Sequence, residues 1–199
     1  MTRPDPLRLL DLAQTRAGAV IAALGPDDWA RPTPCSAWSV RDIVNKLVAS
    51  TWTFTCFARR ERPEPAWDLV EPAEVLGDDP LGTFLDAASK SREAWRAPGA
   101  LEGEAPSTVG DFPAKAVLNA RIFDTTILSW DLATACGLQH GIDDEQAAYV
   151  LRVARALVPN VRAVNPEHYR DPVELGEATP LVDQMIAATG RDPGWRRPG

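Results

Sequence analysis

Helix start and stop signals divide most of this chain into helical segments and leave few stretches with the alternation of a strand. Most segments follow aspartate, serine or threonine, often with proline next or with an acidic or amide residue three positions later. Glycine or proline ends most of them. Helices are predicted from Asp5-Pro6 to Gly25, Ser39 to about Ala58, Asp79-Pro80 to before Pro98, about Pro113 to Cys136, Asp143 to before Pro159, and Thr179-Pro180 to Gly190. The sequence therefore predicts an all-α fold.

The first four helices are long enough to form a four-helix bundle. A proline-rich stretch at 62–78, RPEPAWDLVEPAEVLGD, joins the second helix to the third and predicts a long crossover. The stretch 161–179 is expected to be extended, and helices five and six are additional to the bundle. We expect one domain over residues 1–199, with a C-terminal extension from about residue 138.

Composition excludes several kinds of partner. The chain has 21 Lys and Arg against 28 Asp and Glu, so a net charge of −7 argues against nucleic acid and anionic membranes. The opening residues MTRPDPLRLLDL lack the apolar segment of a secretory signal, so a cytoplasmic location is expected. A monomer or a homodimer is expected. Three widely spaced cysteines form no metal-binding CxxC pair, and the two histidines form no HxxxH pair.

One acidic residue stands on an apolar part of the predicted helix 113–136. At ~100° per residue, Asp124 lies opposite the polar strip of that helix. A buried carboxylate needs a partner, because burying it alone costs several kcal/mol or shifts its pKa. Arg121, one turn earlier, provides a structural partner. The alternative is that Asp124 faces a cavity and meets a ligand, a metal or another helix.

Lys46, on the predicted helix 39–58, is a second charged residue that either faces solvent or lies inside the fold. By the same stepping it lies ~130° from the centre of the apolar face. Periodicity alone therefore favours a solvated lysine whose aliphatic stem covers apolar surface. Ser50 and Phe57 lie on the same side of that helix as Lys46, which is compatible with a second buried interface.

Three blocks of sequence resemble a known family. TPCSAWSVRDIVNKLV at 33–48, FDTTILSWDLATACG at 123–137 and PVELGEATPLVDQMIAATGRDPGW at 172–195 are similar to the mycothiol-dependent maleylpyruvate isomerase branch of the DinB-like superfamily. The resemblance covers nearly the whole chain and implies a DinB-like four-helix bundle.

The resemblance also implies a divalent metal inside the bundle, held by a helix-two histidine and by an acid and a histidine one turn apart. These positions fall at Lys46, Asp124 and Leu128. A protonated lysine and a leucine cannot bind zinc. We therefore expect neither metal nor cofactor, and an inward-facing Lys46 whose ammonium replaces the charge of the metal beside Asp124.

These expectations lead to a functional hypothesis. A Lys46–Asp124 pair in an apolar cavity suits acid–base isomerisation, elimination or cyclisation of a small, largely apolar metabolite, without a metal. A Schiff base on Lys46 is a less favoured route. The candidate substrate-binding residues are Trp52, Arg121, Thr125, Leu128 and Cys56. The alternatives are a non-catalytic binding protein for a small molecule and a mycothiol-dependent transferase or isomerase.

Overall fold

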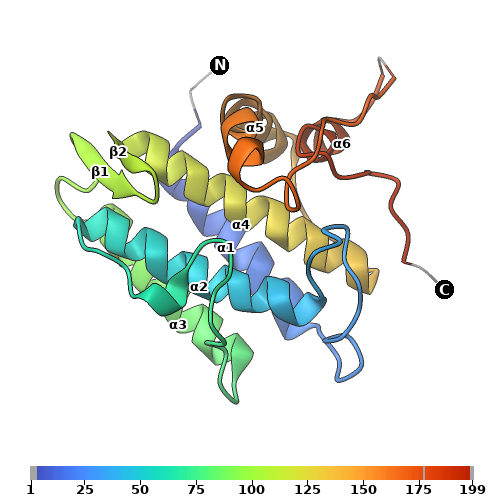
Figure 1. Ribbon diagram of the computed structural model, residues 1–199, viewed down its shortest axis with the longest axis horizontal. Coiled ribbons are helices and arrows are strands. Elements are labelled where there is room, and N and C mark those ends of the chain that lie inside the picture. Colours follow the sequence, from blue (N-terminus) through green and yellow to red (C-terminus); the bar gives the residue numbers. More distant parts are fainter. Residues whose placement is uncertain (1–3, 177, 198–199) are drawn as a thin grey trace.

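The computed structural model describes residues 4–176 and 178–197, and helices make up most of it (Figure 1). Its elements are α1 (Pro6–Ala22), α2 (Val40–Arg59), η1 (Pro65–Trp67), α3 (Pro80–Arg96), β1 (Glu104–Ser107), β2 (Gly110–Pro113), α4 (Ala114–Cys136), α5 (Asp144–Val164) and α6 (Leu181–Ala187). The predicted all-α class and all six predicted helices are confirmed.

The first four long helices form the bundle. Both α1 and α2 pack against α3 and α4, so that α1 lies diagonally opposite α2 in the bundle. Their facing side chains make a core of fully buried leucine, isoleucine, valine and alanine residues. Burial of this apolar surface stabilises the bundle, at roughly 25 cal/mol per Å² removed from water.

The connection between α2 and α3 runs back along α2, as predicted for a crossover. Near its start, the Thr53 hydroxyl donates to the Trp67 carbonyl oxygen at 2.6 Å. Further on, the Asn45 side-chain amide donates to the Ala73 carbonyl oxygen at 2.9 Å. The connection thus returns from the C-terminal half of α2 to its N-terminal half, and α3 runs parallel to α2 (Figure 1).

Capping explains where the helices begin and end. Asp5 caps α1, and Ser39 and Asp42 form the complete capping box predicted for α2. Gly137 ends α4 with φ +68°, a backbone conformation that side chains disfavour. Asp143 and Gln146 predict a second capping box, which forms only in part: the Asp143 side chain accepts from the Gln146 N–H, but the Gln146 side chain donates to the Thr126 hydroxyl on α4.

Two local predictions are also wrong. Helix α5 does not stop before Pro159 but continues through it to Val164. Pro159 is exposed, so water can hydrogen-bond the carbonyl oxygen that the missing N–H leaves free. The antiparallel hairpin β1–β2, in which Glu104 pairs with Pro113, was not predicted because its strands have only four residues each.

The C-terminal helices form an extra layer. Helix α5 packs on α4, and α6 packs on α5 (Figure 1). Between them, residues 165–176 and 178–180 have no regular secondary structure, whereas residues 161–164 of the stretch predicted to be extended belong to α5. Among the described residues, no helix is long and apolar enough to cross a membrane.

Candidate functional site

Lys46 is buried within the fold, in the N-terminal half of α2. Its side chain is only 5% exposed, and its ammonium lies 5.5 Å from the centre of the Trp38 ring. It makes no hydrogen bond or ion pair with any residue that the structure describes. Burial lowers the pKa of Lys46, while the charges of Asp124 and Asp68 oppose that shift. The inward orientation implied by the resemblance is confirmed, and the solvated position favoured by periodicity is wrong.

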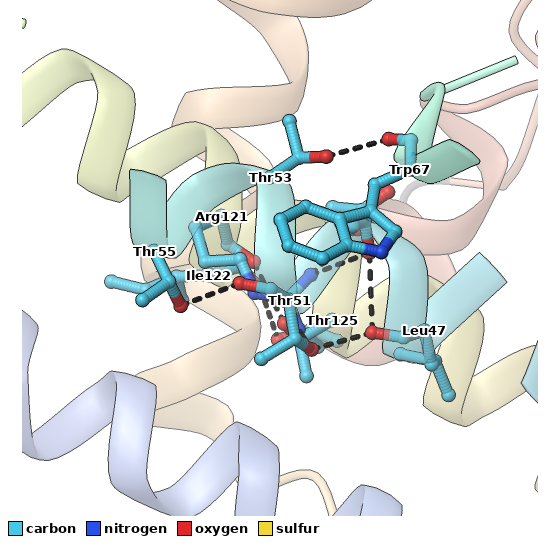
Figure 2. A network of polar contacts seen from close by, with 11 residues as sticks. Leu47, Thr51, Thr53, Thr55, Trp67, Arg121, Ile122 and Thr125 are labelled. Atoms are coloured by element: carbon cyan, nitrogen blue, oxygen red, sulfur yellow. Dashed lines mark hydrogen bonds and ion pairs between the residues drawn. The ribbon is translucent and has the colours of Figure 1, made fainter. Parts of the chain in front are cut away.

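Arg121 and Asp124 form an ion pair on the facing helix α4. The fully buried Arg121 donates from Nη1 to Asp124 Oδ2 at 3.0 Å and to the Ser50 hydroxyl at 2.7 Å. Its Nη2 donates to the Thr51 hydroxyl (Figure 2). Two α2 hydroxyls, those of Ser50 and Thr51, thus hold the guanidinium. Burial lowers the pKa of Arg121 to about 10, although Asp124 acts to raise it.

Asp124 therefore has Arg121, not Lys46, as its ion-pair partner. The charged atoms of Lys46 and Asp124 are more than 4.0 Å apart, so the two residues form no direct salt bridge. Asp124 is nevertheless the acidic group that acts most strongly on Lys46. Its side chain is 15% exposed, in keeping with a carboxylate at the border of the bundle core.

The structure places two further candidate residues near this pair. Thr125 is fully buried, and its hydroxyl donates to the Arg121 carbonyl oxygen at 2.8 Å within α4. Leu128 is 3% exposed and belongs to the apolar cluster that also contains Val44 and Leu47 of α2. These contacts give Thr125 and Leu128 a packing role.

The last two candidates have other neighbours. The half-buried Trp52 stacks on Trp67 with ring centres 5.8 Å apart, and the Lys90 ammonium of α3 lies 4.9 Å from its ring. Cys56 lies near the C-terminal end of α2, where burial raises the pKa of its thiol and nearby charges are those of Glu61, Arg59 and Glu64. No hydrogen bond, ion pair or ring contact among the described residues joins Trp52 or Cys56 to Lys46.

His168, which was not among the predicted site residues, is brought to this region by the C-terminal stretch. The His168 ring packs on Trp38 with ring centres 4.1 Å apart and planes inclined by 34°. Burial lowers the pKa of His168, and the Lys46 ammonium lowers it further. Trp38 belongs to the 33–48 block that carries the family resemblance, but His168 precedes the 172–195 block, so no sequence signal singled it out.

A second buried ion pair fixes the C-terminal stretch to α4. Arg191 donates from Nε to Asp131 Oδ1 and from Nη2 to Asp131 Oδ2, both at 2.8 Å. Its Nη1 donates to the His168 carbonyl oxygen at 3.3 Å. Burial acts to lower the pKa of Arg191, but the adjacent Asp131 carboxylate raises it above its usual value. This pair therefore anchors the backbone that carries His168.

The residues present do not fit the divalent metal that the resemblance implies. Among the residues placed by the structure, no three His, Cys, Asp or Glu side chains are grouped so that they could hold a metal ion. A buried ammonium and a leucine side chain stand at two of the three expected ligand positions, and neither donates an electron pair to a metal.

The bundle helices that carry this site match a known family of domains. The family model described as the mycothiol maleylpyruvate isomerase N-terminal domain matches residues 10–133. The chain belongs to this family. The mycothiol maleylpyruvate isomerase N-terminal domain thus accounts for almost all of α1–α4, which includes Lys46, Arg121 and Asp124, while α5 and α6 lie beyond it.

Relatives and solved structures cover more of the chain. Two Mycobacterium tuberculosis proteins, Uncharacterized protein MT0763 and Uncharacterized protein Rv0738, are each 29% identical over 188 residues, which is 94% of this chain and 98% of the relative. The crystal structure of the mycothiol-dependent maleylpyruvate isomerase matches with a TM-score of 0.69 and 15% identity, covering 95% of this chain and 89% of the enzyme. A histidine-to-alanine variant of it matches with the same TM-score and 16% identity, covering 94% and 88%. The fold of this family member therefore extends beyond the N-terminal domain.

Proposed function

We propose that this protein is a metal-independent enzyme that transfers protons on a small, largely apolar organic molecule, most simply in an isomerisation. The observation that carries the proposal is the state of Lys46. Its ammonium is buried and has no hydrogen-bond partner among the described residues, and the acidic group that acts on it most strongly is Asp124 on another helix. Membership of an isomerase domain family supports the choice of reaction class.

Lys46 is suited to donate a proton or to stabilise a developing oxyanion. Its lowered pKa makes the ammonium a stronger acid than an exposed lysine, which favours proton transfer near neutral pH. Because no described side chain or carbonyl accepts a hydrogen bond from it, an oxygen atom of a substrate can do so. An ammonium in apolar surroundings stabilises an enolate oxygen more strongly than one in water.

Asp124 and Arg121 have supporting roles in the proposal. The Arg121 guanidinium occupies Oδ2 of Asp124 and leaves Oδ1 available to orient the substrate or to accept a proton. Arg121 also adds a second buried positive charge to the same region. A substrate whose charge becomes more negative during the reaction would be stabilised by both cations.

Solvent deuterium incorporation tests the proposal without a known substrate. Protein dialysed against a chelator is incubated in D₂O with a panel of small enolisable carbonyl compounds, including maleylpyruvate, and C–H exchange is followed by proton NMR. We expect exchange by the wild-type protein to survive metal removal and to fall by about 10²-fold or more in Lys46→Met. Lys90→Met, which alters an exposed lysine on α3, should retain it.

Two results would reject this proposal. Exchange that stops on metal removal and returns with added zinc would show that a metal has been recruited by other ligands. Exchange that survives Lys46→Met would show that Lys46 is not the reacting group.

A mycothiol-dependent isomerase is the second candidate, favoured by the family match over residues 10–133. In that case, turnover of maleylpyruvate or a related compound requires added mycothiol. Running the same panel with and without mycothiol separates the two candidates, because proton transfer by Lys46 alone needs no thiol.

A further inference from the structure

We propose that His168 is a second proton-transferring residue of this site, acting as the base that complements Lys46. The proposal rests on the proposed function, because it supplies the partner that acid–base chemistry on Lys46 requires. The Arg121 guanidinium holds Oδ2 of Asp124 at 3.0 Å and leaves only Oδ1 for a substrate, so His168 provides a second acceptor.

The position of His168 carries the argument. The His168 imidazole packs on the Trp38 indole with ring centres 4.1 Å apart. The Lys46 ammonium lies 5.5 Å from the centre of that same indole. Two titratable groups far apart in sequence, on α2 and on the C-terminal stretch, thus border the same Trp38 ring.

The surroundings of His168 suit a base. Its neighbouring charges are Lys46 on α2, Glu71 on the α2–α3 connection, and Glu167 and Arg191 on the C-terminal stretch. Burial and Lys46 lower the pKa of His168, so the imidazole is neutral at neutral pH and can accept a proton. Neither ring nitrogen of His168 hydrogen-bonds to a residue in the described parts of the chain.

The resulting reaction balances without an oxidant or a metal. Neutral His168 removes a proton from a carbon next to a carbonyl group, and the electron pair of that C–H bond moves into an enolate. For a substrate with a carbon–carbon double bond beside that carbon, the enolate is a dienolate, and the Lys46 ammonium then donates a proton to its far (γ) carbon, so that the double bond moves into conjugation with the carbonyl group. The imidazolium returns its proton to the Lys46 amine through solvent, so the net change is an isomerisation of the substrate.

Arg191 and Asp131 are the positioning residues of this arrangement. Arg191 donates from Nη1 to the carbonyl oxygen of His168 at 3.3 Å, while two of its other nitrogens bind Asp131 on α4. The chain of contacts therefore runs from α4 through Arg191 to His168, and from His168 to Trp38. Because Arg191 acts on the backbone, its effect on proton transfer is indirect.

The first test is an NMR titration that requires no substrate. The chain has only two histidines, His140 and His168, so their ring protons can be assigned by substitution. Lys46→Met should raise the pKa of His168 and leave that of His140 unchanged, because the charges near His140 are Asp183 and Arg16. A His168 titration that does not respond to Lys46→Met would overturn the proposal, even if Lys46 itself proves essential for turnover.

The second test uses the deuterium-exchange reaction. His168→Gln should lower kcat by about 10²–10⁴-fold and remove the acidic limb of its pH profile, with a smaller change in KM. His140→Gln is the matched control and should leave both unchanged. Full activity in His168→Gln would show that His168 is not the base, while leaving the role of Lys46 intact. A wild-type protein that catalyses no exchange would reject both the proposed function and this inference.

Discussion

Arg191 and Arg121 are both buried in this protein, and their surroundings differ. Arg191 is 4% exposed and places three nitrogens on partners, two of them on the two oxygens of Asp131. Arg121 is 0% exposed, shares one carboxylate oxygen of Asp124 and otherwise relies on hydroxyl groups. Its Nε is buried without a hydrogen-bond partner in the structure described.

The difference separates a structural ion pair from the region to which we assign the proposed proton transfer. Burying a charge stabilises a fold only when its partner and hydrogen bonds compensate for the lost hydration, as they do at Arg191, although burial still raises the pKa of the Asp131 carboxyl. Around Arg121 the compensation is incomplete, and Lys46 adds another buried cation without a hydrogen bond to any described residue. Incompletely compensated charges with shifted pKa values are characteristic of functional sites.

The largest effect on stability is expected at the buried Asp131–Arg191 pair. Asp131→Asn leaves the Arg191 guanidinium buried without its carboxylate, which should lower the free energy of unfolding by about 3–5 kcal/mol. Urea denaturation followed by circular dichroism measures this loss. Asp86→Asn is the control: it breaks the exposed Lys90–Asp86 pair, whose side chains are 48% and 52% exposed, and should cost at most about 1 kcal/mol. Equal losses in the two variants would contradict the comparison.

A smaller effect is expected from the pairing of Asp124. A double-mutant cycle between Arg121→Met and Asp124→Asn should give a coupling energy of about 1–3 kcal/mol, because the two side chains are in contact. The matching cycle between Lys46→Met and Asp124→Asn should give a smaller value, since those charges are more than 4.0 Å apart. A larger coupling for Lys46 would show that Asp124 changes its partner in solution.

Much of the fold was accessible from local sequence signals. Caps such as Asp5 and Ser39 act within one helical turn, so a single sequence reveals them. The continuation of α5 through Pro159 was not accessible, because it depends on packing and solvent around an exposed proline rather than on propensity. The arrangement of the bundle came from the resemblance, and the family and structural matches confirm it.

The site was accessible only in part. Lys46 was placed correctly by the resemblance and wrongly by periodicity, because helical stepping cannot show that the 33–38 stretch and the C-terminal stretch cover that side of α2. The Asp131–Arg191 pair joins residues 60 positions apart, and no local pattern specifies such a contact. The Arg121–Asp124 pair, one turn apart, was one of two interpretations that the sequence left open.

The next effect is a change in the pH dependence of stability. Burial lowers the pKa of Lys46 in the folded protein below its value of about 10.5 in the unfolded chain. Between these two values the unfolded state binds more protons, so wild-type stability gains a contribution as pH rises through that window. At pH 7, Lys46→Met removes an uncompensated buried charge and should be neutral or stabilising.

Urea denaturation of wild type and Lys46→Met at pH 7 and pH 10 measures this effect. The advantage of the variant should shrink at the higher pH, where the wild-type lysine loses its proton. Lys90→Met, which alters an exposed lysine, corrects for general effects of losing a positive charge. A Lys46→Met variant that is strongly destabilised at pH 7 would show that Lys46 has a partner that compensates its burial.

The smallest effect is expected at Cys56, which tests how far the reactive region extends along α2. The charges that act on this half-buried thiol come from the C-terminal end of the helix and its following loop, whereas those around Lys46 include Asp124 and Arg121. Burial raises the pKa of Cys56, so the residue is a thiol rather than a thiolate at neutral pH and is a poor nucleophile. Cys56→Ser should therefore change the free energy of unfolding by no more than about 0.5 kcal/mol and leave deuterium exchange unaltered. Loss of exchange in Cys56→Ser would mean that the substrate reaches the far end of α2, and the region of incompletely compensated charge around Arg121 would then be only part of the site.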